Sequence, residues 1–508
     1  MSANRRPEFD VAVVGAGPTG LVTSILLAER GHRVVLLDRY PEPYPLPRAV
    51  HFDHEVGRIL QACGIGPELR NIIEPADVYE WRNGEGVPLL RFGLAGDAPS
   101  GWPSSSMFSQ PELEALLGGR VSALPSLELR RGIEVTHLRQ LDDCVELVDA
   151  SGDLITASWV VGADGTRSTI RAELGIEMID LGYFYDWFVI DVILDEPREY
   201  QPINIQVCDP ARPTTAVSGG PGRRRWEFLR LPHEDPAAFY TESSAWELLE
   251  SWDVRPDNSR LERHASYTFQ ARYAETWRRG RVLLAGDAAH QTPPFAGQGM
   301  CAGVRDAVNL AWKQDLVLAG AATGGLLDTY DRERLPHVRR AIEFAIELGK
   351  IICVPDPAEA AARDAAMAPM VADEPMPTPG LPGLDSGCLD LDSPFAGHLF
   401  VQGDVVVHGV AGGVPFDDAV GAGWRMVTNA PVADGALDTE LVEWFSSIGG
   451  AVTPITDPDA TFARWFEEHP VSWALQRPDF HLFGTAADAP GASALLASLR
   501  DLLTAGGH

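Results

Sequence analysis

Three short stretches of this sequence hold residues that could bind a nucleotide, and the first contains the glycines of a phosphate-binding turn. Gly15, Gly17 and Gly20 stand in the pattern G-x-G-x-x-G, directly after a valine-rich run. In such a pattern the first glycine allows a tight turn, the second brings backbone amides to a pyrophosphate, and the third lets a helix pack closely on a strand. The stretch predicts a dinucleotide site that includes Pro18 and Thr19.

An acidic residue stands where a dinucleotide site needs one. Asp38 ends the next predicted strand and is followed by Arg39. A carboxylate at that position accepts a hydrogen bond from a ribose hydroxyl. The alternative is a glycine-rich turn with a capping acid, which would not explain why strand, glycines, helix and acid occur in this order.

The other two stretches bring acids to the ends of buried strands. Residues 159–168 form a strand that ends in Asp164 and a glycine, and Thr166 is placed to cap a helix through Leu174. Residues 281–290 form a second such strand, which brings Gly286 and Asp287 to its carboxyl end. The carboxyl ends of parallel strands are the edge where α/β sheets bind ligands.

The elements that would position these residues form a β-α-β unit. Strands are predicted over residues 9–14 and 33–38, with helical apolar spacing between them over residues 21–30. Short alternating segments over residues 183–269 indicate an inserted, mostly antiparallel sheet. Helical spacing predicts further helices over residues 51–63, 110–121, 303–320 and 326–352.

The fold class that follows is α/β, or mixed α+β, with a Rossmann-like domain, an inserted antiparallel-sheet domain and a separate C-terminal unit. We expect the nucleotide-binding domain to be discontinuous and the inserted domain to hold the substrate. The predicted boundaries are residues 1–75, 100–180 and 266–355 for the nucleotide-binding domain, residues 76–99 and 181–265 for the substrate domain, residues 356–382 for a proline-rich linker, and residues 383–508 for the C-terminal unit.

Composition excludes several classes of function. The 508 residues carry 41 Lys and Arg against 72 Asp and Glu, a net charge of −31 with His neutral, so nucleic acid and anionic membrane surfaces are unlikely partners. The six cysteines show no paired metal or redox spacing, which predicts reduced thiols and no metal site. With neither a leader-like N-terminus nor an uninterrupted apolar span, the cytoplasm is the expected location.

The three stretches, in this order and over roughly residues 8–355, resemble those of the FAD-dependent aromatic hydroxylases. These are the group A flavoprotein monooxygenases, of the p-hydroxybenzoate and phenol hydroxylase type. Within the group the chain is most similar to the 3-(3-hydroxyphenyl)propionate hydroxylases. Segments that carry this similarity are residues 207–210, 225–228, 286–290, 297–299, 305–313 and 327–330.

The resemblance implies roles for individual residues around FAD. Gly15, Gly17, Gly20 and Asp38 would hold the ADP part, Asp287 the ribityl chain, and Asp164 a further part of the nucleotide. The Pro47-Arg48-Ala49 segment would lie beside the flavin, and the Gln110 amide would reach FAD. The C-terminal unit resembles the thioredoxin-like domain of phenol hydroxylases through Arg477-Pro478-Asp479, and without a Cys-x-x-Cys it is assigned no redox role.

The implied activity is hydroxylation of a phenolic aromatic ring with NADH or NADPH and O2, by way of a C4a-hydroperoxyflavin. The protein then supplies geometry and electrostatics. The amides of Gly299 and Met300, after Gly297 and Gln298, could stabilise negative charge on the reduced flavin, and Pro294 would fix a dry loop. The candidates for catalytic groups are His51, Tyr183, Tyr185, His290 and Pro294. For each histidine and tyrosine, an ordinary structural polar group is the alternative.

Other interpretations stay open. The enzyme could be a tailoring oxygenase that performs hydroxylation, epoxidation or Baeyer-Villiger insertion on a larger polyketide-type aromatic, or the chain could be a non-catalytic FAD-binding protein. No second strand-linked glycine motif is present, so NAD(P)H would bind transiently, and the choice between NADH and NADPH is undecided. The C-terminal unit could cover the pocket or form the face of a homodimer.

Overall fold

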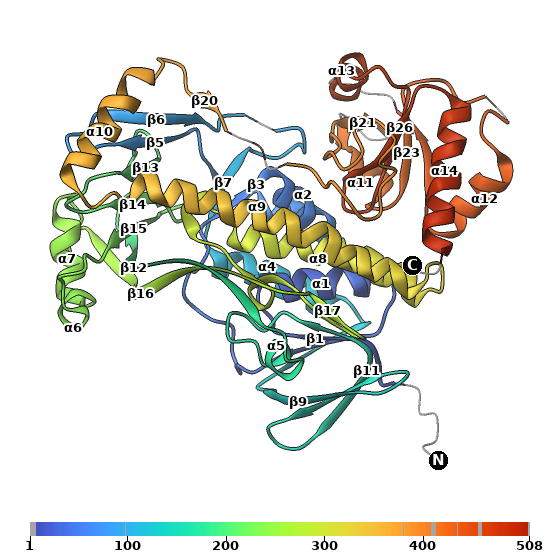
Figure 1. Cartoon of the computed structure of the whole chain (residues 1–508), viewed down its shortest axis with the longest axis horizontal. Helices are drawn as coiled ribbons and strands as arrows, with labels where there is room; N and C mark the ends of the chain where they lie inside the picture. The colour runs from blue at the N-terminus through green and yellow to red at the C-terminus, as the bar shows by residue number, and fades with distance from the viewer. Residues whose placement is uncertain are drawn as a thin grey trace.

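The computed structural model describes residues 7–96, 98–378, 380, 382–407, 413–433, 435–455 and 460–505. Figure 1 shows a nucleotide-binding lobe and a second lobe joined by the long helices α8 (Gly299–Leu318) and α9 (Asp328–Ile352), with the C-terminal unit packed at one end. The mixed α/β fold class predicted from the sequence is confirmed. No helix in the described ranges is long and apolar enough to cross a membrane.

The first sheet has a parallel core in the order β18-β11-β1-β2-β8, with β1 paired to β2 on one side and to β11 on the other. The inner strands are buried valine and leucine runs, as parallel strands covered on both faces require. The strands of this sheet are β1 (Phe9–Val14), β2 (Val34–Asp38), β8 (Leu127–Arg131), β9 (Val135–Gln140), β10 (Val145–Asp149), β11 (Leu154–Gly162), β17 (Arg278–Arg279) and β18 (Val282–Leu284).

The helices around this sheet follow the predicted pattern, with shifts of a few residues at their starts. The predicted helix over residues 51–63 begins later, because Asp53 caps it by accepting a hydrogen bond from Val56 N at 3.2 Å. Ser168, not Thr166, caps the helix after the second acidic turn. α8 starts at 299 instead of 303. The elements around the sheet are β3 (His51–Asp53), β4 (Ile73–Pro75), β7 (Ser105–Phe108), α1 (Pro18–Glu29), α2 (His54–Leu60), α3 (Gly66–Leu69), α4 (Gln110–Ala123) and α5 (Thr169–Glu173).

The second sheet is the large, mostly antiparallel one, in the order β19-β16-β12-β15-β14-β13-β5-β6-β20. Its long strands β12 and β16 pair over most of their length and run toward the first sheet. Its strands are β5 (Val78–Arg82), β6 (Pro88–Gly93), β12 (Met178–Leu194), β13 (Asn204–Val207), β14 (Thr214–Ser218), β15 (Arg223–Leu229), β16 (Ser259–Ala274), β19 (His290–Gln291) and β20 (Met376–Pro377), with α6 (Pro236–Phe239) and α7 (Glu242–Glu250) beside them.

The stretch 356–382, predicted to be a linker, contains folded elements. Asp356 caps α10 (Pro357–Met367) by accepting hydrogen bonds from two backbone amides. Arg363 ties that helix to the second sheet by donating to the carbonyl of Cys208 at 2.6 Å. β20 then adds to the sheet edge beside β6. Proline and alanine content alone therefore misled the prediction, because capping and pairing with a distant edge order this stretch.

The C-terminal unit has a four-stranded sheet in the order β24-β23-β25-β26, in which β23 is parallel to β24 and antiparallel to β25. Buried ion pairs join it to the rest of the chain: Arg477 contacts Glu333 of α9 at 2.6 Å, and Arg58 of α2 contacts Asp417 at 2.6 Å. The elements are β21 (Asp404–Val406), β22 (Gly413–Pro415), β23 (Arg425–Thr428), β24 (Ala451–Pro454), β25 (Trp473–Gln476), β26 (Leu482–Ala486), α11 (Phe416–Val420), α12 (Thr439–Ser447), α13 (Thr461–Glu468) and α14 (Ala489–Thr504).

Candidate active site

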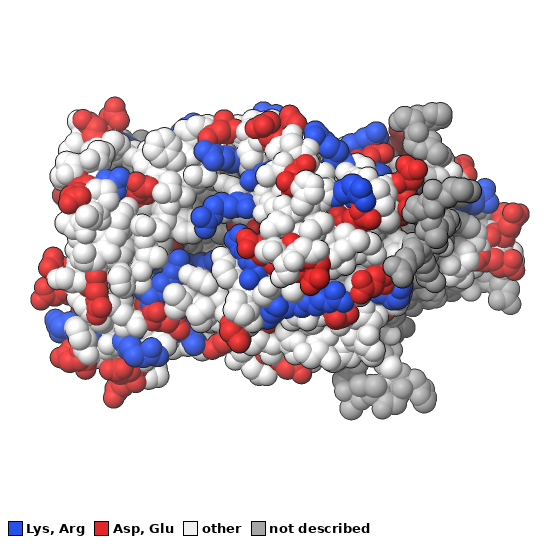
Figure 2. Space-filling model, turned by 90° about the horizontal axis from the view of Figure 1, so that it is seen from below, with Lys and Arg blue, Asp and Glu red and all other residues white. Residues whose placement is uncertain are grey.

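One cavity of about 2100 Å³ runs from the glycine turn after β1 to the face of the second sheet and on to the C-terminal unit. A single small ligand occupies a pocket of about 300 to 1,000 Å³, so this cavity has room for a dinucleotide and a second molecule. Figure 2 shows basic side chains gathered around a recess on one face of this otherwise acidic protein. The arginines that line the cavity are Arg48, Arg167, Arg171, Arg225, Arg263, Arg272 and Arg305.

The three glycines of the turn have different surroundings. A Cβ atom on Gly15 would collide with the carbonyl of Ala163, and one on Gly20 would collide with the carbonyl of Gly15. A Cβ on Gly17 would meet only the end of the Arg48 side chain, at 4.0 Å, and Gly17 lines the cavity. Gly15 and Gly20 therefore allow close packing, whereas Gly17 leaves space on the cavity side. Pro18 and Thr19, at the start of α1, line the same space.

Asp38 orders the glycine turn from the neighbouring strand. Its carboxylate accepts hydrogen bonds from the backbone amides of Ala16 at 2.7 Å and Tyr40 at 2.8 Å. Neither Asp38 nor Arg39 lines the cavity, and the Arg39 guanidinium lies over the exposed Tyr40 ring. The contact of Asp38 with a ribose stays a prediction, while the structure assigns it the loop contact.

The acids after β11 and β18 differ in what they can bind. Asp164 accepts hydrogen bonds from the Ser168 hydroxyl at 2.5 Å and the Ile170 amide at 3.1 Å, so it orders the start of α5 and does not line the cavity. Asp287 lines the cavity and accepts a hydrogen bond from no residue in the described ranges. Burial raises the pKa of Asp287, while His290 and Arg48 oppose the rise. Its free oxygens suit a ligand hydroxyl.

These two acids give a testable contrast. We expect Asp287→Ala to weaken FAD binding about 10- to 100-fold without lowering the melting temperature of the apoprotein, because only a ligand contact is lost. Asp164→Ala should lower the apoprotein's free energy of unfolding by about 1 to 2 kcal/mol, because it removes a helix-start contact. Equilibrium dialysis with FAD and urea denaturation measure the two effects. Equal loss of FAD affinity in both variants would contradict this division of roles.

The Pro47-Arg48-Ala49 segment is held from both sides at the cavity wall. Gln110 accepts a hydrogen bond from the Ala49 amide at 2.7 Å and donates to Glu114 at 2.6 Å. On the other side Arg225 donates to the carbonyl of Arg48 at 2.6 Å. The Gln110 oxygen is therefore already engaged within the protein, and its predicted contact with FAD depends on the remaining N–H. Both Arg48 and Gln110 line the cavity.

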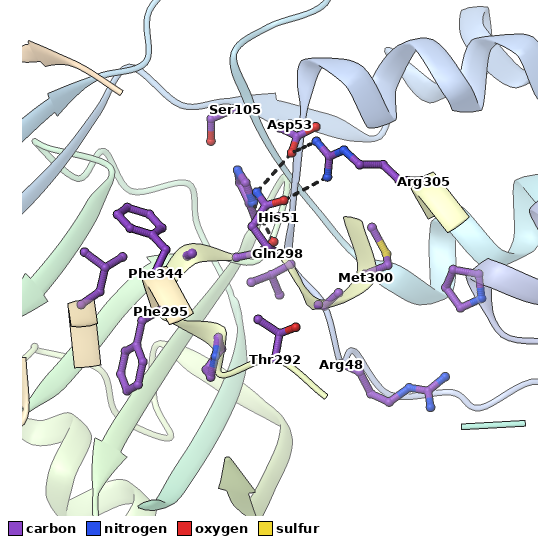
Figure 3. Close-up of a pocket in the computed structure, with 18 of the residues that line it drawn as sticks. Arg48, His51, Asp53, Ser105, Thr292, Phe295, Gln298, Met300, Arg305 and Phe344 are labelled. Carbon is purple, nitrogen blue, oxygen red and sulfur yellow. Dashed lines mark hydrogen bonds and ion pairs between the residues drawn. The ribbon is translucent and has the colours of Figure 1, made fainter. Parts of the chain in front are cut away.

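The loop before α8 lies at the centre of the cavity (Figure 3). All five residues that the sequence predicts here for the flavin site line the cavity: Pro294, Gly297, Gln298, Gly299 and Met300. The last two stand in the first turn of α8, where backbone amides have no partner within the helix. The arrangement can bind negative charge through these amides and the helix dipole.

Sequence analysis missed an ion cluster that holds this loop. Arg305 of α8 contacts Asp53 at 2.6 Å and Glu55 at 2.5 Å, and Gln298 bonds to both Arg305 and Asp53 (Figure 3). Burial would raise the pKa of Asp53, but Arg305 outweighs it and holds that pKa well below its ordinary value. Asp53 and Arg305 are 252 residues apart, so only the folded chain brings them together.

His51 is the one predicted histidine that faces the cavity. It lines the wall with Asp53 nearby, and its Nδ1 atom lies 3.4 Å from the carbonyl oxygen of Gly297. Burial lowers the pKa of His51, although Asp53 opposes the shift, so the ring is neutral near pH 7. The Gly297 carbonyl favours the tautomer with its proton on Nδ1, which leaves Nε2 as an acceptor.

The catalytic roles of Tyr183, Tyr185 and His290 stay predictions, and the structure places none of the three in the cavity wall. The ring of Tyr183 packs against Gly349 of α9 and lies edge-on to Tyr185, with centroids 5.1 Å apart. His290 is fully buried, with Nε2 2.7 Å from Asp306. Asp306 also accepts a hydrogen bond from the Gly286 amide at 3.0 Å. His290 and Gly286 therefore order the turn that presents Asp287.

The residues fit FAD. The glycine turn leaves space beside a helix N-terminus for a pyrophosphate, and a free carboxylate faces the cavity for a hydroxylated chain. The amides of Gly299 and Met300, which have no partner within α8, belong to residues that line the same cavity. The second sheet supplies an aromatic wall to the same cavity, formed by Tyr79, Trp81, Phe92, Tyr267 and Phe269. The protein can therefore hold a flavin next to an aromatic molecule.

Comparisons with known proteins agree with this geometry. The FAD binding domain family matches residues 8–345. The chain is 38% identical to a probable NADH-specific resorcinol 4-hydroxylase of Rhodococcus jostii (strain RHA1), over 95% of this chain and 93% of that protein. It is 32% identical to a 3-(3-hydroxy-phenyl)propionate/3-hydroxycinnamic acid hydroxylase of Burkholderia cenocepacia (strain HI2424), over 98% of each.

Solved structures extend the comparison to the whole fold. The structure of aklavinone-11 hydroxylase with FAD and aklavinone aligns with a TM-score of 0.78 at 26% identity, and covers 98% of this chain and 99% of that one. Two relatives above 30% identity that align over nearly their whole length, and a family match to about two thirds of the chain, agree on one assignment. The chain therefore belongs to the FAD binding domain family, as one of its FAD-dependent aromatic hydroxylases.

Proposed function

We propose that this enzyme uses NADH and O2 to hydroxylate a small phenol, and that resorcinol is the substrate to test first. The observation that carries the proposal is the single cavity that joins the dinucleotide site to an aromatic wall of the second sheet. The relative from Rhodococcus jostii, which is named for NADH and resorcinol, supports the choice of both molecules.

When bound, FAD supplies the activation of O2 and the transfer of one oxygen atom to the ring. The protein's contribution is positioning and electrostatics. The amides of Gly299 and Met300 would stabilise negative charge at the helix start, where no rearrangement is needed. Pro294 has no N–H to hydrate, and the rings of Phe295 and Phe344 line the same region and exclude water (Figure 3).

His51 is the residue that we propose as proton acceptor. A phenolate ring is more nucleophilic than a phenol, so a nearby base promotes hydroxylation. The neutral ring with its proton on Nδ1 can take the phenol proton on Nε2, and Asp53 then stabilises the cation. The role of His51 is tested by the pH profile of the His51→Gln variant, which should lack the acidic limb that the wild type shows.

A second candidate function is favoured by the size of the cavity. A volume of about 2100 Å³ also admits a larger polycyclic aromatic beside FAD, and the solved relative with bound aklavinone is of that kind. This alternative predicts a tailoring oxygenase.

We also propose that the protein is located in the cytoplasm, because all six cysteines are buried and unpaired. A homodimer stays an expectation.

The test is the oxidation of NADH and NADPH by the yellow holoenzyme, with H2O2 and hydroxylated product measured in parallel. The panel contains resorcinol, phenol, 3-(3-hydroxyphenyl)propionate and a polycyclic phenol such as aklavinone. Stimulation by resorcinol with one product molecule per NADH would support the proposal. Stimulation by the polycyclic phenol alone would favour the second candidate. H2O2 formation without product from any of them would refute both.

A further inference from the structure

A row of paired side chains, with a carboxylate in it, crosses the cavity face of the second sheet. On β12, β15 and β14, Val189, Glu227 and Thr215 are directly paired. The row continues through Gln206 of β13 to Trp81 of β5. Residues paired in this way point to the same face of a sheet. Val189, Glu227, Thr215 and Trp81 all line the cavity, so this face places a carboxylate between Val189 and Thr215 in the cavity wall.

The Glu227 carboxylate has no hydrogen-bond donor within the part of the chain that the structure describes, although the residue is only 9% exposed. The nearest cation, Arg225 Nη1, lies 3.8 Å away. Arg225 instead donates to both oxygens of Asp191, at 2.6 and 3.0 Å, and to the Arg48 carbonyl at 2.6 Å. Burial raises the pKa of Glu227, and Arg225 opposes the rise.

The neighbouring hydroxyl groups are engaged elsewhere. Thr215 donates to the side-chain oxygen of Gln206 at 2.8 Å, and Tyr79 donates to the same oxygen at 3.3 Å. A buried carboxylate without a donor costs free energy, which a ligand that brings an O–H group would recover. The group that fits here is therefore a hydrogen-bond donor on the ligand.

Glu227 lies within reach of a ring bound beside the flavin segment. Arg225, two residues away on β15, donates to the Arg48 carbonyl of the segment that lines the flavin side of the cavity. The same Arg225 Nη1 atom lies 3.8 Å from Glu227 Oε1 and 2.6 Å from the Arg48 carbonyl oxygen, so these two oxygens are less than about 6.5 Å apart. A single aromatic ring can bridge a distance of this order, with one edge toward the flavin and another toward β15.

We propose that the Glu227 carboxylate determines specificity by accepting a hydrogen bond from a hydroxyl group of the aromatic substrate. The inference rests on the proposed function, and it names the group that recognises the substrate. It predicts a preference for a second hydroxyl on the ring over a methoxy group at the same position.

The experiment compares resorcinol with 3-methoxyphenol in the wild-type holoenzyme and in Glu227→Leu, Glu227→Gln and Glu262→Gln. Glu262, the matched control, lies on β16 of the same sheet and does not line the cavity. For resorcinol we expect kcat/KM to fall about 100-fold in Glu227→Leu and about 10-fold in Glu227→Gln, whose amide oxygen still accepts a hydrogen bond. For 3-methoxyphenol, kcat/KM should change less than about threefold in both Glu227→Leu and Glu227→Gln.

Parallel losses for the two phenols would show that Glu227 only supports the sheet, and would overturn the proposal. FAD content and melting temperature identify any variant that misfolds. If the variants misfold, the wild type still tests the proposal, because equal kcat/KM values for resorcinol and 3-methoxyphenol would overturn it. If no phenol stimulates NADH oxidation by the wild type, the proposed function fails and this inference falls with it.

Discussion

Replacing Glu333 by Gln is expected to lower the free energy of unfolding by about 3 to 5 kcal/mol, because it removes the anion at the centre of a fully buried cluster. Glu333 of α9 contacts Lys313 at 2.9 Å and Arg477 at 2.6 Å, and accepts hydrogen bonds from Asn309 and the amide of Cys388. Without its charge, two buried cations lose their shared partner. Urea denaturation at pH 7 measures the loss.

The pH dependence of this loss provides a second measurement. Burial alone would raise the pKa of Glu333, but Arg477 and Lys313 lower it from 4.5 to about 2. A lowered pKa in the folded state contributes stability that is complete above pH 4.5 and is lost as the pH falls toward 2. The difference between wild type and variant should therefore shrink over that range.

The control is Glu343→Gln on the exposed side of the same helix. Glu343 pairs with Arg339 at 2.8 Å, and both side chains are about half exposed. A pair of that kind contributes less than about 0.5 kcal/mol. If Glu333→Gln and Glu343→Gln cost the same, the buried cluster does not anchor the C-terminal unit as we argue.

The same cluster explains the Arg477-Pro478-Asp479 segment without redox chemistry. Asp479 accepts hydrogen bonds from Asn309 at 2.9 Å and from the Trp312 indole at 3.0 Å, both on α8. The C-terminal unit also contributes His398, Leu399 and His481 to the wall of the cavity. The unit therefore closes part of the active site as well as packing on the outside of the helices that form it.

Sequence reasoning worked where the signal is local. A glycine turn between a strand and a helix, and an acid directly after a strand, depend on a few neighbouring residues, so Gly17 and Asp287 could be assigned to the cavity. The start of α8 was missed by four residues because Gln298 accepts from the Ala302 amide at 2.8 Å and begins the helix early.

The same reasoning failed where long-range pairing decides the outcome. Tyr183 stands on β12 of the second sheet, but its ring packs against α9 and does not line the cavity. Asp53 meets Arg305, and Glu227 faces the cavity, only because distant strands and helices assemble. A local motif does not tell which way such a side chain points, because its neighbours across a sheet are set by the register of the whole sheet.

Replacing Gly17 by Val should give a folded protein that has lost its yellow colour. Gly17 precedes α1 with φ −78° and ψ −179°, a conformation open to any residue, and its Cβ position points into the cavity. The apoprotein should therefore keep its melting temperature within a few degrees. The added methyl groups would occupy the space that the pyrophosphate needs, so we expect FAD affinity to fall at least about 1,000-fold, or ~4 kcal/mol.

Gly20→Val is the contrasting variant, because a Cβ there collides with the Gly15 carbonyl inside the protein. We expect that variant to unfold, whether or not FAD is present. Gly119→Ala, at an exposed position of α4 where a Cβ meets no atom within 4 Å, controls for the loss of a glycine. If Gly17→Val binds FAD as tightly as the wild type, the pyrophosphate does not lie against this turn. Since Gly15, Gly17 and Gly20 share one motif, only their different surroundings predict that one substitution abolishes binding and another abolishes folding.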